Sequence, residues 1–289
     1  MSQKRTLQQL TFKDNFMFAA TMSQPENCRM VLERILERPI ERVEISKEKS
    51  LIFNPEYHGV RLDVYAKDEK NTHYDVEMQV ATKKVLKRIR YYHGQMDMEL
   101  IGTGMDYEEL PESYVIFICD FDPLGLGKYR YTLKQSLWEA PDYAYEDGVH
   151  TILLNTKGAN EEEVPTELVR FLHFVGAKLE ESTNDFGDSL VEQLQKTVRE
   201  VKQSRVMGGR YMQLEELLKD EYSAGKAEGK AEGKAESVLF LLDSCGQVPE
   251  KVKQKIHSIT DEACLRKLLM TAAKAETIEA FLEKAEEIW

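Results

Sequence analysis

Two acidic residues, Asp63 and Glu77, lie at the outer ends of a segment whose pattern is typical of a β-hairpin. Residues 60–66 and 74–80 alternate apolar and polar side chains, which places one set on each face of a sheet. A hairpin centred on Lys70 sets the two carboxylates directly opposite each other, with Cβ atoms about 5 Å apart. Like charges repel at that distance, and a divalent cation relieves the repulsion, because carboxylate oxygens suit Mg²⁺ and Mn²⁺. The spacing therefore predicts metal-dependent phosphodiester chemistry.

The same alternation assigns the faces of the hairpin. Gln79 follows Glu77 by two residues and so shares its face, where it can orient a water molecule or a phosphate oxygen. The apolar set is expected to face the core, and it consists of Leu62, Val64, Ala66, Tyr74, Val76, Met78 and Val80. Most alternating polar residues of a hairpin simply face solvent, and this reading stands beside the catalytic one.

A basic segment follows the hairpin. We expect a helix from residue 83 to about residue 100, and its start could bind the phosphate backbone through Lys83, Lys84, Lys87 and Arg88. A second group of candidates could complete a cleft: Asp14, Arg88, Tyr92 and Gln95. The alternatives are a solvated basic helix surface, tyrosines that pack the helix onto the sheet, and an Asp14 that caps the first helix.

Composition limits the function classes. The net charge of −12 argues against a protein that coats DNA, but residues 1–100 carry 17 Lys and Arg against 15 Asp and Glu, so the acidic excess lies beyond the candidate site. We expect no membrane-spanning helix and no secretory signal. The four cysteines form no CxxC pair, which favours free thiols in a reducing cytoplasm. The histidines show no zinc spacing, and no P-loop or nucleophile elbow occurs.

Patterns along the chain predict further elements. Helices are expected over residues 12–36 with a break at Pro25, over 165–181 and over 190–221, and strands over 43–46, 113–121, 129–134 and 150–155. Residues 1–160 are expected to form the core, and 161–222 a helical extension. The tract 223–236 repeats Gly-Lys-Ala-Glu and is equally compatible with a flexible linker and a frayed helix. Residues 237–289 are expected to form a helical tail, and self-association through this C-terminal region is a weaker expectation.

Several segments together resemble a known family. They are Phe12–Phe18, the Arg-Leu-Asp-Val-Tyr and Asp-Val-Glu-Met-Gln strands at 61–65 and 75–79, the Arg-Ile-Arg-Tyr-Tyr segment at 88–92, and residues 113–123. The chain is similar to the Rpn family of recombination-promoting nucleases, which are also described as PD-(D/E)XK nuclease family transposases. The resemblance covers nearly the whole chain. It implies an α/β restriction-endonuclease-like core, with a mixed central sheet flanked by helices and a helical C-terminal extension.

The resemblance also implies function and roles. It implies Mg²⁺-dependent DNA cleavage linked to recombination in the cytoplasm, with Asp63 and Glu77 as catalytic metal ligands and the main-chain carbonyl of Met78 as a further ligand. Gln79 takes the place of the lysine in the wider superfamily, so a neutral amide stands where a cation is usual. Its work could then shift to Arg88 or Lys83. DNA cleavage differs from DNA joining, and no residue pattern here indicates strand transfer.

Two other functions remain open at this stage. The chain could be a catalytically silent binding module that acts through its helical C-terminal region. The acidic sequence beyond residue 100 and the Gly-Lys-Ala-Glu tract favour this slightly. An RNA substrate is a weaker alternative to DNA.

Overall fold

The computed structural model describes residues 5–46, 50–51 and 60–289. The chain divides into two compact units, Met1–Gly208 and Gly209–Trp289. The first unit contains the sheet, five α-helices that pack around it, and three short 3-10 helices among the described residues, namely η1 (Leu7–Gln9), η2 (Tyr107–Glu109) and η3 (Glu161–Glu163).

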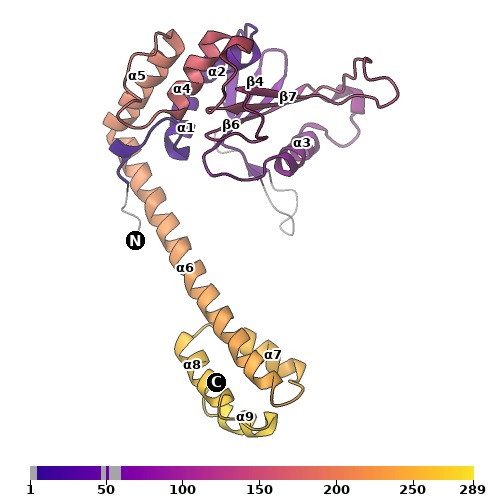
Figure 1. Cartoon of the computed structure of the whole chain (residues 1–289), viewed down its shortest axis with the longest axis vertical. Coiled ribbons are helices and arrows are strands. Elements are labelled where there is room, and N and C mark those ends of the chain that lie inside the picture. Colours follow the sequence, from indigo (N-terminus) through magenta and orange to yellow (C-terminus); the bar gives the residue numbers. More distant parts are fainter. Residues whose placement is uncertain (1–4, 47–49, 52–59) are drawn as a thin grey trace. The chain divides into compact units, whose positions relative to one another are not determined.

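The central sheet of the first unit is mixed. Its six strands lie in the order β1 (Val43–Ser46), β4 (Val64–Asp68), β5 (His73–Gln79), β6 (Ser113–Cys119), β8 (Val149–Asn155) and β7 (Arg130–Leu133). Strands β5, β6 and β8 are parallel, whereas β1, β4 and β7 each run antiparallel to their neighbours. Helices flank both faces (Figure 1), so the expected fold class is confirmed. A separate two-stranded sheet joins β2 (Ser50–Leu51) to β3 (Val60–Arg61).

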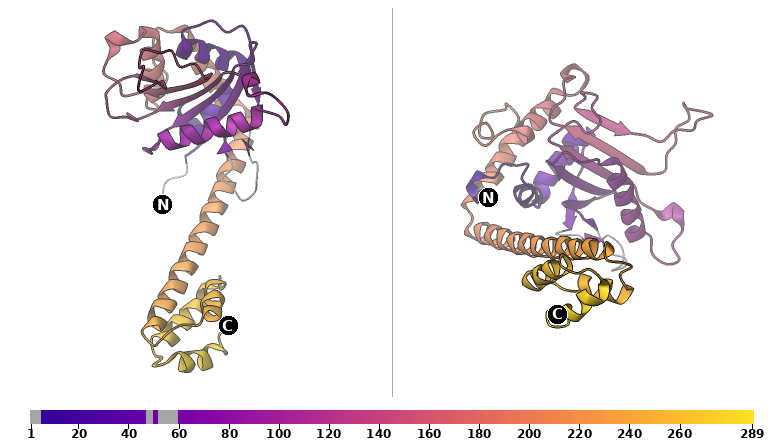
Figure 2. Two further views of the ribbon diagram at one scale, coloured as in Figure 1. Left: turned by 90° about the vertical axis from the view of Figure 1, so that its right-hand side faces the viewer. Right: turned by 60° about the horizontal axis from the view of Figure 1, so that its bottom comes forward.

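The two faces of the sheet are covered differently. Helices α1 (Asn15–Met22), α2 (Pro25–Leu36), α4 (Thr166–Gly176) and α5 (Ser189–Gln203) pack on one face, around the larger core cluster. Helix α3 (Leu86–Leu100) lies along the other face, as Figure 2 shows, and closes a smaller cluster. A central strand covered on both sides has few exposed residues, and every residue of β5 is buried.

The turn of the hairpin fixes its register. Oδ1 of Asp68 accepts hydrogen bonds from the N–H groups of Lys70 and Thr72, each at 2.9 Å, and Asn71 adopts a left-handed backbone with φ of 64°. Aspartate closes turns in this way, and asparagine tolerates that backbone. The resulting register pairs Val64 with Val76 and continues toward Asp63 opposite Glu77, so the register predicted from the sequence is confirmed.

The prediction for the first strand of the hairpin is wrong in one respect. The strand is interrupted at residues 62 and 63, and its beginning pairs with β2 instead of β5. Because of this interruption, the side chain of Leu62 packs in the cluster under α3, on the same face of the sheet as Tyr65. The alternating pattern had predicted that it would share the opposite face with Val64. Val80 was also expected in the core, but it lies beyond the end of β5 and is 44% exposed.

Several helix boundaries differ from the sequence predictions, beginning with the first helix, which starts at Asn15 rather than at residue 12. Helix α3 begins at Leu86 rather than at residue 83, so Lys83 and Lys84 lie in the segment before it. Helix α4 ends at Gly176, five residues early. The helix expected over 190–221 is two helices, because the chain breaks at Ser204 between α5 and α6 (Arg205–Asp243). A uniformly charged helical pattern carries little signal for such a break.

The second unit is wholly helical among its described elements. It contains most of α6, together with α7 (Glu250–His257), α8 (Glu262–Ala272) and α9 (Ile278–Ala285), which pack as a small bundle (Figure 2). The Gly-Lys-Ala-Glu tract is helical and lies within α6. Ala231 and Ala235 of this tract are buried in the bundle core, where a small side chain permits close helix approach. None of the described helices has the length and apolar character needed to cross a membrane.

Candidate active site

Three acidic side chains gather under α3. Asp75 and Glu77 alternate with core residues along β5 and face α3, and Asp63 approaches Glu77 from the end of the neighbouring strand. The N–H of Asp63 donates to Oε1 of Glu77 at 2.9 Å, and the N–H of Met78 donates to Oδ2 of Asp63 at 3.1 Å. These two bonds hold the two carboxylates side by side. The structure thus brings Asp63 and Glu77 together as the hairpin pattern predicted.

Burial sets the charge state of these acids. Glu77 is 4% exposed, and its burial, with the adjacent charge of Asp63, raises its pKa to about 7. Asp75 is fully buried, and burial followed by the charges of Glu77 and Asp63 raises its pKa well above the usual range. Neither oxygen of Asp75 accepts a hydrogen bond from a described N–H or O–H donor. Burial without a donor therefore favours the protonated, neutral form of Asp75.

Arg88 is the cation that faces this cluster. From the first turn of α3 it donates to Oε2 of Glu77 at 3.1 Å, to Oε1 of Gln79 at 2.6 Å and to the hydroxyl of Tyr92 at 2.8 Å. Its guanidinium carbon also lies 5.1 Å from the ring centroid of Phe117. A guanidinium on an aromatic ring with several acceptors is held in one orientation. Its side chain keeps 36% exposure, so it borders solvent.

Gln79 is oriented by its neighbours. Its Oε1 accepts from Arg88, and its Nε2 donates to the main-chain oxygen of Ala81 at 2.7 Å. The amide therefore has partners at both ends, and its contact with Arg88 places a positive charge beside the position where the wider superfamily carries lysine. In this arrangement Gln79 contacts Arg88, which in turn contacts Glu77.

The other predicted residues are placed around this cluster or apart from it. Tyr92 belongs to it through Arg88, and Gln95 lies one helical turn further along α3, half-buried. Lys83, Lys84 and Lys87 are exposed near the start of α3. Asp14 precedes α1, pairs with Arg5 and accepts from the N–H of Thr11, so its contacts are those of the N-terminal segment.

Sequence reasoning missed Asp75 and Phe117. Asp75 was recognisable in the sequence as the first of three polar residues at every second position. Its burial, however, depends on tertiary packing, which the alternating pattern does not predict. Phe117 reads as a residue of a continuously apolar strand. Nothing in that run marks the one ring that supports Arg88.

A family model described as PD-(D/E)XK nuclease family transposase matches residues 12–227. The chain belongs to this family. Membership of the PD-(D/E)XK nuclease family transposases supports a nuclease-like or transposase-like function, and nucleases of this kind typically use divalent metal ions. Searches of curated proteins and of solved structures found no significant match.

The acids of this family member suit a small hard cation. In the described part of the chain, no three His, Cys, Asp or Glu side chains converge as a complete metal site. Mg²⁺, however, usually keeps several waters and uses only one or two carboxylates. Burial and the adjacent charge of Asp63 raise the pKa of Glu77, so holding both carboxylates ionised side by side is electrostatically unfavourable without a further cation. A divalent cation held by Asp63 and Glu77 would supply the missing positive charge.

Proposed function

We propose that the chain is a Mg²⁺-dependent DNA endonuclease of the recombination-promoting type, which hydrolyses phosphodiester bonds. The observation that carries the proposal is the pair Asp63 and Glu77, held side by side at the end of β5 with Arg88 against them. Family membership supports the reaction class. It also supports a cytoplasmic location and a role in recombination, which we propose with it.

In this proposal Asp63 and Glu77 hold the cation, with the main-chain carbonyl of Met78 as a further ligand by analogy with the family. The cation, Mg²⁺ or Mn²⁺, would polarise the scissile phosphate and lower the pKa of an attacking water. Arg88 orients and neutralises a non-bridging phosphate oxygen, because its guanidinium borders solvent beside the acids. Gln79 keeps Arg88 in place.

The DNA backbone would be bound by the basic segment before and at the start of α3. Exposed lysines lie there, namely Lys83, Lys84 and Lys87, and the first turn of α3 contains no acidic residue that would neutralise them. The N-terminal end of a helix adds a partial positive charge. These lysines would position the strand across the acid pair without reading its sequence.

A plasmid assay tests the proposed reaction. The purified full chain is expected to convert supercoiled plasmid to nicked or linear DNA in Mg²⁺ and in Mn²⁺, and to lose this activity in EDTA. Plasmid that stays supercoiled under every metal condition would favour the alternative, a silent binding module that acts through its C-terminal helices. An equal RNA-cleaving activity would extend the substrate class without changing the mechanism.

Arg88 gives a second prediction. Arg88→Gln removes the positive charge beside Glu77, so cleavage is expected to fall by about 10- to 100-fold, and the pH–rate profile should shift to higher pH because the pKa of Glu77 rises further. Arg88→Lys should retain part of the cleavage rate, since lysine keeps the positive charge but lacks the paired N–H donors of a guanidinium. The matched control is Arg90→Gln, an exposed residue of the same helix. Equal profiles for Arg88→Gln and Arg90→Gln would remove Arg88 from the site.

We also propose that copies of the chain associate through the C-terminal region. Helix α6 carries large apolar side chains that are well exposed in the second unit, among them Leu218, Tyr222 and Phe240, at 50%, 71% and 77%. Several large exposed apolar side chains on one helix are typical of an interaction surface. Light scattering on the full chain tests this, and a monomer mass at micromolar concentration would contradict it.

A further inference from the structure

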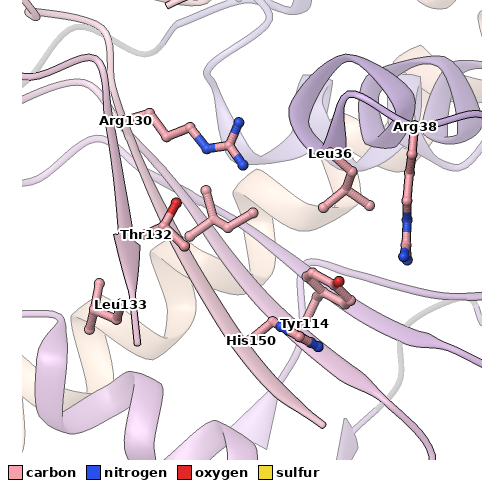
Figure 3. Close-up of a pocket in the computed structure, with 8 residues that line it drawn as sticks. Leu36, Arg38, Tyr114, Arg130, Thr132, Leu133 and His150 are labelled. Atoms are coloured by element: carbon pink, nitrogen blue, oxygen red, sulfur yellow. The ribbon is translucent and has the colours of Figure 1, made fainter. Parts of the chain in front are cut away.

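A cavity of about 180 Å³ lies on the face of the sheet opposite the acid cluster. Its lining includes Arg38, Tyr114, Arg130, Thr132 and His150 (Figure 3). A cavity of about 150 Å³ is large enough for a benzene ring, so this one has room for a phosphate or a single ring.

Strand register separates the cavity from the acids. Tyr114 pairs with Tyr74 of β5 and with His150 of β8, so these three side chains share one face at the beginning of the parallel strands. Glu77 is an odd number of residues from Tyr74 and therefore points to the other face, nearer the end of β5. The cavity is thus a second site, distinct from the candidate active site.

The floor of the cavity is aromatic. The rings of Tyr114 and His150 are stacked, with centroids 4.2 Å apart and planes 15° apart. Burial lowers the pKa of His150, which keeps this imidazole neutral near pH 7. Leu36, Leu133 and Ile152 complete the wall with apolar surface. Tyr114 also stacks on Tyr74, with centroids 5.4 Å apart, so both faces of its ring are covered and the cavity offers ring edges and apolar side chains to a ligand.

Two arginines border the same space from opposite sides (Figure 3). Arg38 donates to the hydroxyl of Tyr74 at 3.0 Å, and Arg130 pairs with Glu37 at 2.6 Å. A guanidinium has five N–H donors, and each of these contacts occupies few of them. Among the described residues Arg38 has no carboxylate ion-pair partner, so the cavity border keeps a positive charge with unused donors.

We propose that this cavity binds the phosphate of a phosphate monoester carried on a nucleoside, with the phosphate between Arg38 and Arg130 and the nucleoside extending past the exposed residues Thr132 and Leu133. Guanidinium groups match phosphate oxygens with paired hydrogen bonds, and a dianion gains from two of them. The phosphate monoester has two sources, a free nucleotide and the phosphorylated end of a DNA strand. The proposal does not rest on the nuclease reaction.

Calorimetry on the full chain in EDTA tests the proposal, because EDTA removes the metal ion that the proposed cleavage requires. Adenosine monophosphate is expected to bind, and adenosine to bind at least about tenfold more weakly. Arg38→Gln and Arg130→Gln should each weaken nucleotide binding by about tenfold or more. Thr132→Phe should abolish it by filling the cavity while both charges remain. Arg42→Gln, an exposed arginine paired with Glu44, is the control and should bind as the parent does.

Two further arms complete the design. A 5′-phosphorylated oligonucleotide that binds better than its 5′-hydroxyl form, and loses that advantage in Arg38→Gln, identifies a strand end as the source. Glu77→Gln should leave nucleotide binding unchanged, which separates this site from the active site. Equal binding of adenosine and its monophosphate, or parent-like binding by both Arg38→Gln and Thr132→Phe, would overturn the proposal.

Discussion

Asp63→Asn and Glu77→Gln are each expected to reduce plasmid cleavage in Mg²⁺ by at least roughly 100-fold. Either change removes one of the two carboxylates proposed to hold the cation, while an amide oxygen can still accept the main-chain hydrogen bond that each now accepts. The loss should therefore come from chemistry and not from unfolding. Initial nicking rates, measured with thermal melting of each variant, provide the comparison.

The matched control for these variants is Glu69→Gln. Glu69 is an exposed acid in the turn of the same hairpin, so its neutralisation changes net charge equally without touching the cluster. Its nicking rate should equal that of the parent. Parent-like cleavage by Asp63→Asn and Glu77→Gln, with normal melting, would place the catalytic residues elsewhere in the chain.

The second large effect concerns stability and pH. The pKa of Glu77 is about 7 in the folded chain, well above the ordinary value of a glutamate, so the folded state binds more protons between about pH 4.5 and 7. Stability from this group is full at low pH and falls as pH rises through 7. The shift corresponds to at most about 3 kcal/mol. Glu77→Gln removes the unfavourable free energy of burying an ionised carboxylate at this position. The variant should therefore be more stable than the parent at pH 8 and nearly equal to it at pH 5.

Urea unfolding without divalent cations, at pH 5, 6, 7 and 8, measures this difference. Other acids contribute in the opposite direction, because hydrogen bonds lower the pKa of Asp120 and Asp122, so the difference between variant and parent isolates Glu77. Glu108→Gln, at an exposed position of η2, is the control and should show no pH-dependent gain. A parent–variant difference that stays constant from pH 5 to pH 8 would show that Glu77 titrates normally.

The sequence predicted the geometry of the hairpin because its determinants are local. Period-two alternation and the turn at Asp68–Asn71 set which residues lie opposite each other, and both can be recognised in a short segment. The sheet, its parallel centre and its flanking helices followed from longer apolar patterns and from the family resemblance, and the structure and the family match confirm that fold.

The burial of the acids could not be predicted in this way. Alternation gives the same pattern for a face in solvent and for a face under a helix, and only tertiary packing places α3 over Asp75 and Glu77. That packing also decides the partner of Gln79 and the orientation of Arg88. Leu62 lies on the face opposite to the predicted one because the strand is interrupted at residues 62 and 63. No residue type in this segment indicates that interruption.

The central claim is that Asp63 and Glu77 hold one divalent cation, and calorimetry with Mn²⁺ on the full chain tests it most directly. The parent should show saturable binding that strengthens from pH 6 to pH 8, as Glu77 loses its proton. Asp63→Asn should abolish this binding, and Glu69→Gln should leave it intact. Mn²⁺ binding of equal affinity in the parent and in Asp63→Asn, or no binding to the parent at pH 8, would contradict the account.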